Sequence, residues 1–411
     1  MEQQNMEKYA QLVLQKGVNI QKNQPLVINA PIEGAYFVRE MAKQAYALGA
    51  KEVHVNWADD TLTYLTYKHA NEEVFQTYPK WKVMLQESYA EQGAAFVSIH
   101  ATDPDLLQDV DPTRIAEANK SAGIALKTYR EYIMNDKVCW TVISIPTTGW
   151  AKKIFPDVSE EEAIGKLWHE IMKMVRVDKE DPIAAWDTHN DLLKKANDYL
   201  NEKQYEKLVL KAEGTNLEVG LPKDHIWAGG VAISEDGTVF NPNMPTEEVF
   251  TAPHKYNVNG VVSSTKPLNY GGNVIDDFQL TFKDGMVVDY QAKQGEEVLK
   301  HLLESDDGAK RLGELALVPH ESPISQSGLI FYNTLFDENA SCHIALGKAY
   351  PTNVARGPEM DEAALDKNGI NDSMVHVDFM IGSAEMNIDG VTADGKVEPI
   401  FKDGTWAVTF K

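Results

Sequence analysis

A histidine and an aspartate alternate with apolar residues near the C-terminal end of the sequence. Residues 375–379, Val-His-Val-Asp-Phe, have the pattern of a strand, in which successive side chains point to opposite faces. His376 and Asp378 therefore share one face, and the three apolar side chains commit the other face to a core. An imidazole beside a carboxylate suits a divalent metal ion, although such a pair is more often an ordinary structural contact.

Another carboxylate and another imidazole lie upstream of this strand. Glu338 and His343 lie where a helix end leads into a strand that we expect at 343–346, and both can face one cleft. The structural alternative is a helix cap for Glu338 and a hydrogen-bonded core position for His343.

Carboxylates also occur in apolar surroundings, where an unpaired charge is costly. Glu314 lies in a Leu-Gly-Glu-Leu run, and the pair Glu247-Glu248 precedes a Val-Phe dipeptide. Adjacent residues of an extended segment face opposite ways, so only one of Glu247 and Glu248 can enter a given site, and the local sequence does not choose between them. The alternative at these positions is an ion pair, for which Arg311 is the obvious partner.

Carboxylates and imidazoles without thiolates suit zinc, cobalt or manganese at a hydrolytic site, whereas a structural zinc site uses cysteines. The only cysteines are Cys139 and Cys342, too few for a disulfide framework in 411 residues, and we expect Cys342 to be a core residue. This usage fits a reducing compartment, and the N-terminal residues lack the apolar stretch of a signal peptide. We therefore expect a cytoplasmic protein.

Composition argues against two classes of partner. With 62 acidic and 39 basic residues the formal charge is −23, which repels nucleic-acid phosphates and anionic lipid surfaces. The sequence also contains no run of ~18 apolar residues that would form a transmembrane helix. We expect neither nucleic acid nor a membrane as a partner.

Two domains must position these residues, because 411 residues exceed what one hydrophobic core usually organises. Up to about residue 145, short apolar strands alternate with helical patterns, which predicts a mainly parallel sheet flanked by helices. The turn after the first expected strand, at 26–28, offers a single glycine, Gly34, next to an acidic residue. We therefore expect no dinucleotide site on this sheet.

The pattern changes after two helices that we expect at 160–177 and 183–203. Short strands and glycine turns follow, with hairpin turns expected at Asp389-Gly390, Asp394-Gly395 and Asp403-Gly404. We place the boundary at residue 195, within the range 190–205. Residues 1–195 are then an α/β domain, and residues 196–411 are an α+β domain rich in antiparallel strands that contains every ligand named above.

With these segments in order, the chain resembles the thermophilic-type metalloaminopeptidases, the group of aminopeptidase T, aminopeptidase S and PepS. The resemblance runs essentially end to end and rests on five ordered segments: 243–250, 312–314, 342–347, 349–351 and 375–382. It implies removal of N-terminal residues from short peptides that have a free N-terminus. It also implies two divalent ions per chain, and a homodimer whose active sites face an internal cavity formed with the N-terminal domain.

The resemblance also assigns residues. Members commonly have Gly-Glu where this chain has Glu247-Glu248, which makes Glu248 a ligand and leaves Glu247 without a role. The other implied metal ligands are Glu314, His343, His376 and Asp378, with Glu338 and Tyr350 lining the same site.

Two ions together can activate water and polarise a scissile carbonyl, so an unligated carboxylate must move the proton. Our first choice for that base is Glu338, and the second is Glu314. Tyr350 would donate to the oxyanion or bind a metal. The ions would be zinc, cobalt or manganese, with magnesium possible.

Two other functions remain to be weighed against this one. The first is a two-metal dipeptidase or amidohydrolase that uses the same chemistry. The second is a non-catalytic binding or scaffold protein, in which the N-terminal sheet holds a ligand and the carboxylates serve as ion pairs.

Overall fold

The computed structural model describes residues 3–270 and 273–410, which form two compact units. The first unit comprises the chain up to His189 together with two later segments, Val231–Pro245 and Ile330–Leu335. The second comprises Asn190–Gly230, Thr246–Leu329 and Phe336–Lys411. The predicted boundary at residue 195, as a division between independently folding domains, stays a prediction.

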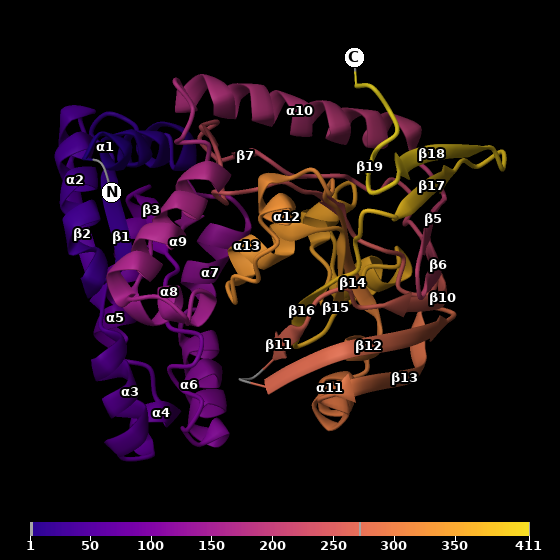
Figure 1. The fold of residues 1–411 in the computed structure, drawn as a ribbon, viewed down its shortest axis with the longest axis horizontal. Helices are drawn as coiled ribbons and strands as arrows, with labels where there is room; N and C mark the ends of the chain where they lie inside the picture. Colours follow the sequence, from indigo (N-terminus) through magenta and orange to yellow (C-terminus); the bar gives the residue numbers. More distant parts are fainter. Residues whose placement is uncertain (1–2, 271–272, 411) are drawn as a thin grey trace. The chain divides into compact units, whose positions relative to one another are not determined.

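The first unit is built on a four-stranded sheet with the order β2-β1-β3-β4. Figure 1 labels β1, β2 and β3 of this sheet. Its strands are β1 (Pro25–Pro31), β2 (Glu52–Ala58), β3 (Ala95–Ile99) and β4 (Trp140–Ile143), and all three pairings are parallel. The central strands are almost wholly buried and apolar, as expected for a parallel sheet covered by helices. The predicted parallel α/β fold is confirmed.

Helices cover both faces of this sheet. On one face, Tyr9, Phe37 and Trp168 pack as an aromatic cluster, with ring centroids 5.1 Å apart for the first pair and 6.2 Å for the second. The helices of this unit are α1 (Gln3–Leu12), α2 (Ala35–Ala47), α3 (Asp60–His69), α4 (Glu73–Gln76), α5 (Lys80–Glu91), α6 (Pro112–Ala125), α7 (Lys127–Met134), α8 (Thr148–Ile154) and α9 (Glu160–Met174).

Local signals explain where several of these helices begin and end. The Ser159 hydroxyl accepts a hydrogen bond from the Glu162 amide at the start of α9, and Asp111 caps α6 ahead of its N-terminal proline. Gly49 follows α2 with φ +96°, a conformation that glycine adopts without steric cost. A small hairpin of β7 (Ala232–Ile233) and β8 (Val239–Phe240) also belongs to the first unit.

The long helix α10 (Pro182–Lys203) leads into the second unit, which contains two antiparallel sheets. The larger has nine strands in the order β11-β12-β10-β6-β5-β17-β18-β19, with β13 paired to β12. These strands are β5 (Lys207–Ala212), β6 (Thr215–Gly220), β10 (Val258–Ser263), β11 (Leu268–Tyr270), β12 (Asn273–Lys283), β13 (Met286–Gln294), β17 (Asn387–Val391), β18 (Val397–Lys402) and β19 (Thr405–Trp406).

The smaller sheet has the order β16-β15-β14-β9 and consists of β9 (Val249–Thr251), β14 (Leu312–Leu317), β15 (His343–Gly347) and β16 (His376–Met380). The short helices of this unit are α11 (Glu296–Leu303), α12 (Pro323–Ser327) and α14 (Glu362–Lys367), and α13 (Thr334–Asp337) begins in the first unit. The predicted antiparallel α+β fold is confirmed. Among helices of the described residues, none has the length and apolar content needed to cross a membrane.

One expected turn is wrong. Asp389 and Gly390 lie inside β17. Gly395 and Gly404 do occupy the expected turns, with positive φ, between β17 and β18 and between β18 and β19. A Cβ at position 390 would lie 2.6 Å from the Tyr205 ring, so this glycine allows close packing across the strand instead of a reversal of the chain.

A half-buried carboxylate ties the end of α10 to β18 and makes a pH-dependent contribution to stability. Glu398 accepts hydrogen bonds from Lys203 Nζ at 2.6 Å and from the Tyr205 hydroxyl at 2.9 Å, and Lys203, Lys396 and Tyr205 lower its pKa to about 2. Because the folded-state pKa is lowered, this stabilisation is present above about pH 4.5 and is lost as the pH falls towards 2.

We expect Glu398→Gln to lower the free energy of unfolding at pH 7 by about 1 kcal/mol, since it removes charge-assisted hydrogen bonds that are partly screened by solvent. The difference from the parent should narrow at pH 3. Urea unfolding at both pH values measures this, with Glu213→Gln at the exposed β5–β6 turn as control. An equal destabilisation at pH 7 and pH 3 would contradict the assignment.

Candidate metal centre

The smaller sheet of the second unit has two unlike faces. In its register, Ala316 lies opposite both Phe250 and His343, and Ala345 lies opposite both Glu314 and Asp378. Directly opposed residues share a face, so all of these side chains point the same way. The intervening residues, Val249, Leu315, Leu317, Ile344, Leu346 and Phe379, belong to the hydrophobic core.

A β-bulge brings Glu314 onto the face with the histidines. The register shifts between Leu312 and Glu314, which leaves Gly313 as the extra residue. Leu312 and Leu315 both remain in the core, and Glu314 between them points to the opposite face. Only glycine fits at the bulge, because a Cβ at position 313 would lie 2.3 Å from the Lys348 carbonyl oxygen.

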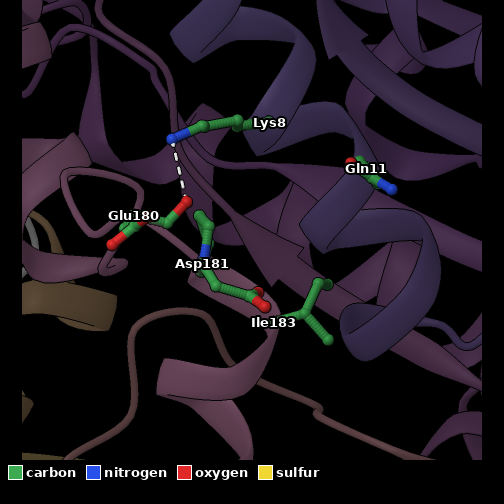
Figure 2. Close-up of a pocket in the computed structure, with 6 residues that line it drawn as sticks. Lys8, Gln11, Glu180, Asp181 and Ile183 are labelled. Carbon is green, nitrogen blue, oxygen red and sulfur yellow. Dashed lines mark hydrogen bonds between the residues drawn. The ribbon is translucent and has the colours of Figure 1, made fainter.

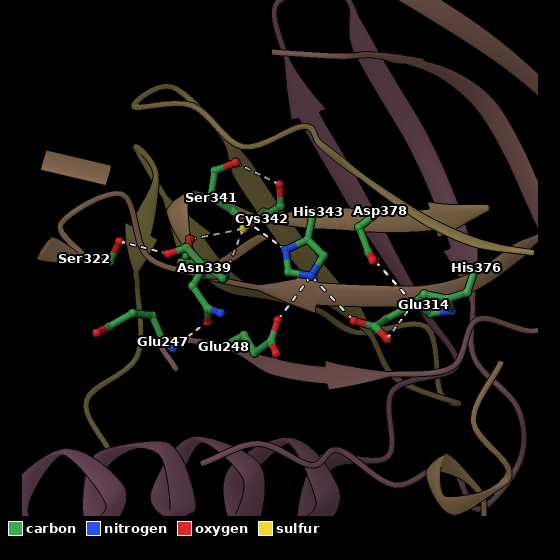
Figure 3. A network of polar contacts seen from close by, with 11 residues as sticks. Glu247, Glu248, Glu314, Ser322, Asn339, Ser341, Cys342, His343, His376 and Asp378 are labelled. Atoms are coloured by element: carbon green, nitrogen blue, oxygen red, sulfur yellow. Dashed lines mark hydrogen bonds and ion pairs between the residues drawn. The ribbon is translucent and has the colours of Figure 1, made fainter. Parts of the chain in front are cut away.

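The first group of potential ligands surrounds His343 (Figure 3). Its Nε2 lies 3.1 Å from Glu248 Oε2 and 3.5 Å from Glu314 Oε1, and all three side chains are buried. The ligand atoms of these residues lie within 4.8 Å of one another, close enough to hold one cation. Glu248, rather than Glu247, is thus the glutamate of this pair that faces the histidine.

The second group shares Glu314 with the first. His376 Nε2 lies 3.6 Å from Glu314 Oε2 and 3.4 Å from Asp378 Oδ1. Glu314 therefore directs one carboxylate oxygen to each histidine, and Figure 3 shows it between them. The ligand atoms of Glu314, His376 and Asp378 also lie within 4.8 Å of one another.

Backbone carbonyls fix how both imidazoles present their nitrogens. His343 Nδ1 donates to the Ser341 carbonyl at 3.1 Å, and His376 Nδ1 donates to the Lys348 carbonyl at 2.7 Å. In the neutral imidazole, Nε2 is then an unprotonated acceptor directed at carboxylate oxygens. Two acceptors this close repel each other unless a proton or a metal ion lies between them.

Charge crowding shifts the ionisation of these groups. Burial alone would lower the pKa of His343, but Glu248 and Glu314 outweigh it and raise the pKa well above its usual value. The same balance, with Asp378 as the main partner, raises the pKa of His376 to about 9. Burial and the neighbouring carboxylates likewise raise the pKa of Glu314. These shifts mark a site that gains stability from positive charge.

The described residues fit a metal in a further respect. Glu248 Oε2 and Asp378 Oδ1 are buried and accept no hydrogen bond of good geometry, although a histidine nitrogen lies within ion-pair distance of each. Buried polar atoms are normally satisfied, so oxygens in this state suit a cation that accepts other geometries. Divalent zinc, cobalt or manganese binds such oxygen and nitrogen sets.

Glu338 and Tyr350 border the same cluster. Glu338 begins a turn that packs against β16; burial, with Glu248 and Asp378 next in importance, raises its pKa well above the usual value. The Tyr350 ring lies 5.2 Å from the His376 ring and 6.2 Å from the Phe250 ring, measured between centroids. Burial and the carboxylates raise the pKa of its hydroxyl, which keeps the phenol protonated. The structure thus brings all seven predicted site residues together.

Two buried asparagines that the sequence did not single out hold this arrangement. Asn339 Oδ1 accepts a hydrogen bond from the Glu247 amide at 2.7 Å, which ties the segment before β9 to the residue after Glu338. Asn353 receives the Ile226 amide on its carbonyl and donates its Nδ2 to the Ile226 carbonyl at 3.1 Å, three residues after Tyr350. Their partners are remote in sequence, so no local pattern could have revealed them.

The alternative ion pair between Glu314 and Arg311 does not occur. Arg311 Nη1 donates to the Lys255 carbonyl at 2.7 Å, and its guanidinium lies 4.9 Å from the centroid of the Tyr256 ring. Cys342 is a core residue as expected, and its buried thiol lies 3.4 Å from the Val318 carbonyl.

A hollow in the first unit offers no comparable set of ligands. It has a volume of about 390 Å³ and is lined by Lys8, Gln11, Glu180, Asp181, Pro182 and Ile183 (Figure 2). Lys8 Nζ already donates to the carbonyls of Lys179 and Glu180, both at 3.2 Å. We assign no site there.

Comparison with known proteins agrees with this geometry. The sequence is 60% identical over 405 residues to aminopeptidase 2 of Geobacillus stearothermophilus and 54% identical over 404 residues to aminopeptidase AmpS of Bacillus subtilis. Each alignment covers 98% of both proteins. The solved structure of wild-type AmpT from Thermus thermophilus is similar with a TM-score of 0.93 and 41% identity, covering 98% of this chain and 99% of that one.

The family described as thermophilic metalloprotease (M29) matches residues 2–406, and its members use divalent metal. Together with the relatives named as aminopeptidases, which align over 98% of their length, this match confirms the resemblance seen in the sequence. The chain belongs to the M29 family of thermophilic metalloproteases and is a metal-dependent peptidase that hydrolyses peptide substrates.

Proposed function

We propose that this protein is an aminopeptidase that removes the N-terminal residue from short peptides at a site with two divalent ions. The observation that carries the proposal is Glu314, whose two carboxylate oxygens each face a different histidine. Glu248 and His343 would complete one ion's ligands, and His376 and Asp378 the other's, with Glu314 as the bridge. Zinc, cobalt or manganese suits these ligands, and magnesium is possible.

When bound, such ions lower the pKa of water and polarise a scissile carbonyl. Glu338 takes the proton from the attacking water and returns it to the leaving amine. The raised pKa of Glu338 follows from burial and neighbouring negative charge. Positive charge from bound ions would counter both causes and favour the ionised carboxylate, which is the form that a base requires. The Tyr350 hydroxyl, kept neutral by its surroundings, donates a hydrogen bond to the developing oxyanion.

The proposed substrates have a free N-terminus. Glu248, Glu314, Glu338 and Asp378 place four carboxylates against two imidazoles in and around the site, a negative charge that the two proposed divalent ions would balance. The carboxylates therefore do not by themselves select a substrate ammonium. The relatives named as aminopeptidases support the same substrate class.

We further propose that the protein works in the cytoplasm as a homodimer. Support for association comes from large apolar side chains exposed on the first unit, which include Leu62, Trp81, Met84 and Ile124, each more than 60% exposed. The two cysteines are both free and buried, which suits a reducing compartment.

Exhaustive chelation should abolish release of free amino acids from di- and tripeptides, and zinc or cobalt should restore it, because the ligand set performs no hydrolysis without a cation. Liquid chromatography of the products measures this. Acetylated peptides serve as the control, and their cleavage would favour an amidohydrolase instead. Full activity after chelation would exclude the proposal.

Glu314→Gln should lower the metal content more than Glu248→Gln does. The first removes a carboxylate that serves both ions, so nearly two ions per chain should be lost, and the second should cost about one. Elemental analysis after dialysis measures the stoichiometry, and circular dichroism checks folding. Equal losses in the two variants would argue against a bridging role for Glu314.

Glu338→Gln should retain the metal but reduce kcat by about 10²–10⁴-fold, because the amide cannot accept the proton from water. Metal content and steady-state kinetics are measured on the same preparation. Normal turnover with full metal content would transfer the base role to another carboxylate.

A further inference from the structure

Phe250 is an aromatic residue on the metal-binding face that the proposed chemistry does not use. Strand β9 places Phe250 opposite Ala316 of β14, and Ala316 in turn lies opposite His343. Glu248 precedes Phe250 by two residues and shares its face, as its 3.1 Å approach to His343 requires. An apolar ring therefore lies directly beside a potential metal ligand.

The ring is accessible, in contrast to its neighbours on the strand. Val249 and Thr251 are completely buried, whereas Phe250 is only half-buried. It packs against Tyr350 with ring centroids 6.2 Å apart and an interplanar angle of 65°. Because Ala316 carries only a methyl group, no bulky side chain of β14 separates Phe250 from the histidine.

The backbone at Phe250 is held by β14 on one side and by Ala228 on the other. The Phe250 amide donates to the Ala228 carbonyl at 2.8 Å, and its carbonyl accepts from the Ala228 amide at 3.0 Å. Gly229, with φ +147°, permits this contact, since a Cβ there would lie 2.3 Å from the Glu248 carbonyl oxygen. A side chain on such a rigid strand contacts a ligand with a small entropic cost.

These observations identify what the ring would contact. In a peptide whose N-terminus lies at this cluster, the side chain of the first residue is attached to the α-carbon that also carries the terminal nitrogen. Phe250 is the aromatic residue of β9, and it shares the face of Glu248 while Val249 between them is buried in the core. We propose that Phe250 is a specificity-determining residue that contacts the N-terminal side chain of the substrate and favours large apolar residues there. This inference rests on the proposed aminopeptidase function.

Three dipeptides test it: Leu-Gly, Ala-Gly and Ala-Leu. Phe250→Ala should lower kcat/KM for Leu-Gly about 10-fold, a typical loss when apolar contact is removed from a pocket, and leave the two alanyl substrates within about twofold. Phe250→Leu keeps an apolar surface and should retain most of the preference. Tyr290→Ala, which removes a half-buried ring from β13, is the matched control and should leave the Leu-Gly to Ala-Gly ratio unchanged.

The outcomes separate this inference from the function on which it depends. A metal-replete parent that cleaves none of the three dipeptides would refute the aminopeptidase proposal itself. An active parent whose Phe250→Ala variant loses the same factor on all three would refute the specificity role and leave a structural one. A loss that follows the second residue, seen with Ala-Leu, would overturn the assignment to the N-terminal side chain.

Discussion

The second unit holds several negatively charged side chains close together on one largely buried face of its smaller sheet. Glu248, Glu314 and Asp378 face only two imidazoles on one side of a four-stranded sheet, and Glu338 adds a fourth carboxylate. Removing even one ion from water costs several kcal/mol after relaxation, so this arrangement is unstable without compensating cations. Protons on the histidines provide some of that charge, and divalent ions would provide more.

The rest of the sheet explains how the fold tolerates such a cluster. Its opposite face is committed to an apolar core, which fixes the register and prevents the ligands from moving to the other side. Ala345 lies between Glu314 and Asp378, and Ala316 lies between His343 and Phe250, so no large side chain at either position fills the space that an ion requires. Backbone carbonyls orient both imidazoles, so the direction of each Nε2 does not depend on flexible side chains.

Two glycines and two asparagines help to position the candidate ligands, although none of them has a role in the proposed reaction. Gly313 forms the bulge that redirects Glu314, and Gly229 lets a loop lie on the backbone of Glu248. Asn339 and Asn353 connect segments that lie roughly a hundred residues apart in the sequence. Each acts through the position of another residue, so the chemistry of such a site depends on residues outside the ligand set.

The sequence by itself determined which side chains could be ligands and which alternated on a strand. The parity of residues 376–379 placed His376 and Asp378 on one face, and the structure agrees, because alternation is a local property of an extended chain. It also indicated a parallel α/β unit followed by antiparallel strands, since the period of apolar residues differs between these structures.

Only the tertiary structure decided which segments meet. Local sequence left Glu247 and Glu248 equivalent, and the pairing of β9 with β14 selected Glu248. The bulge at Gly313 shifted the parity of Glu314, and Gly390 served close packing where a turn was expected. The approach of Glu248 to His343 and of Glu314 to His376 joins residues 95 and 62 positions apart, and it depends on sheet register and side-chain packing, which no window of neighbouring residues contains.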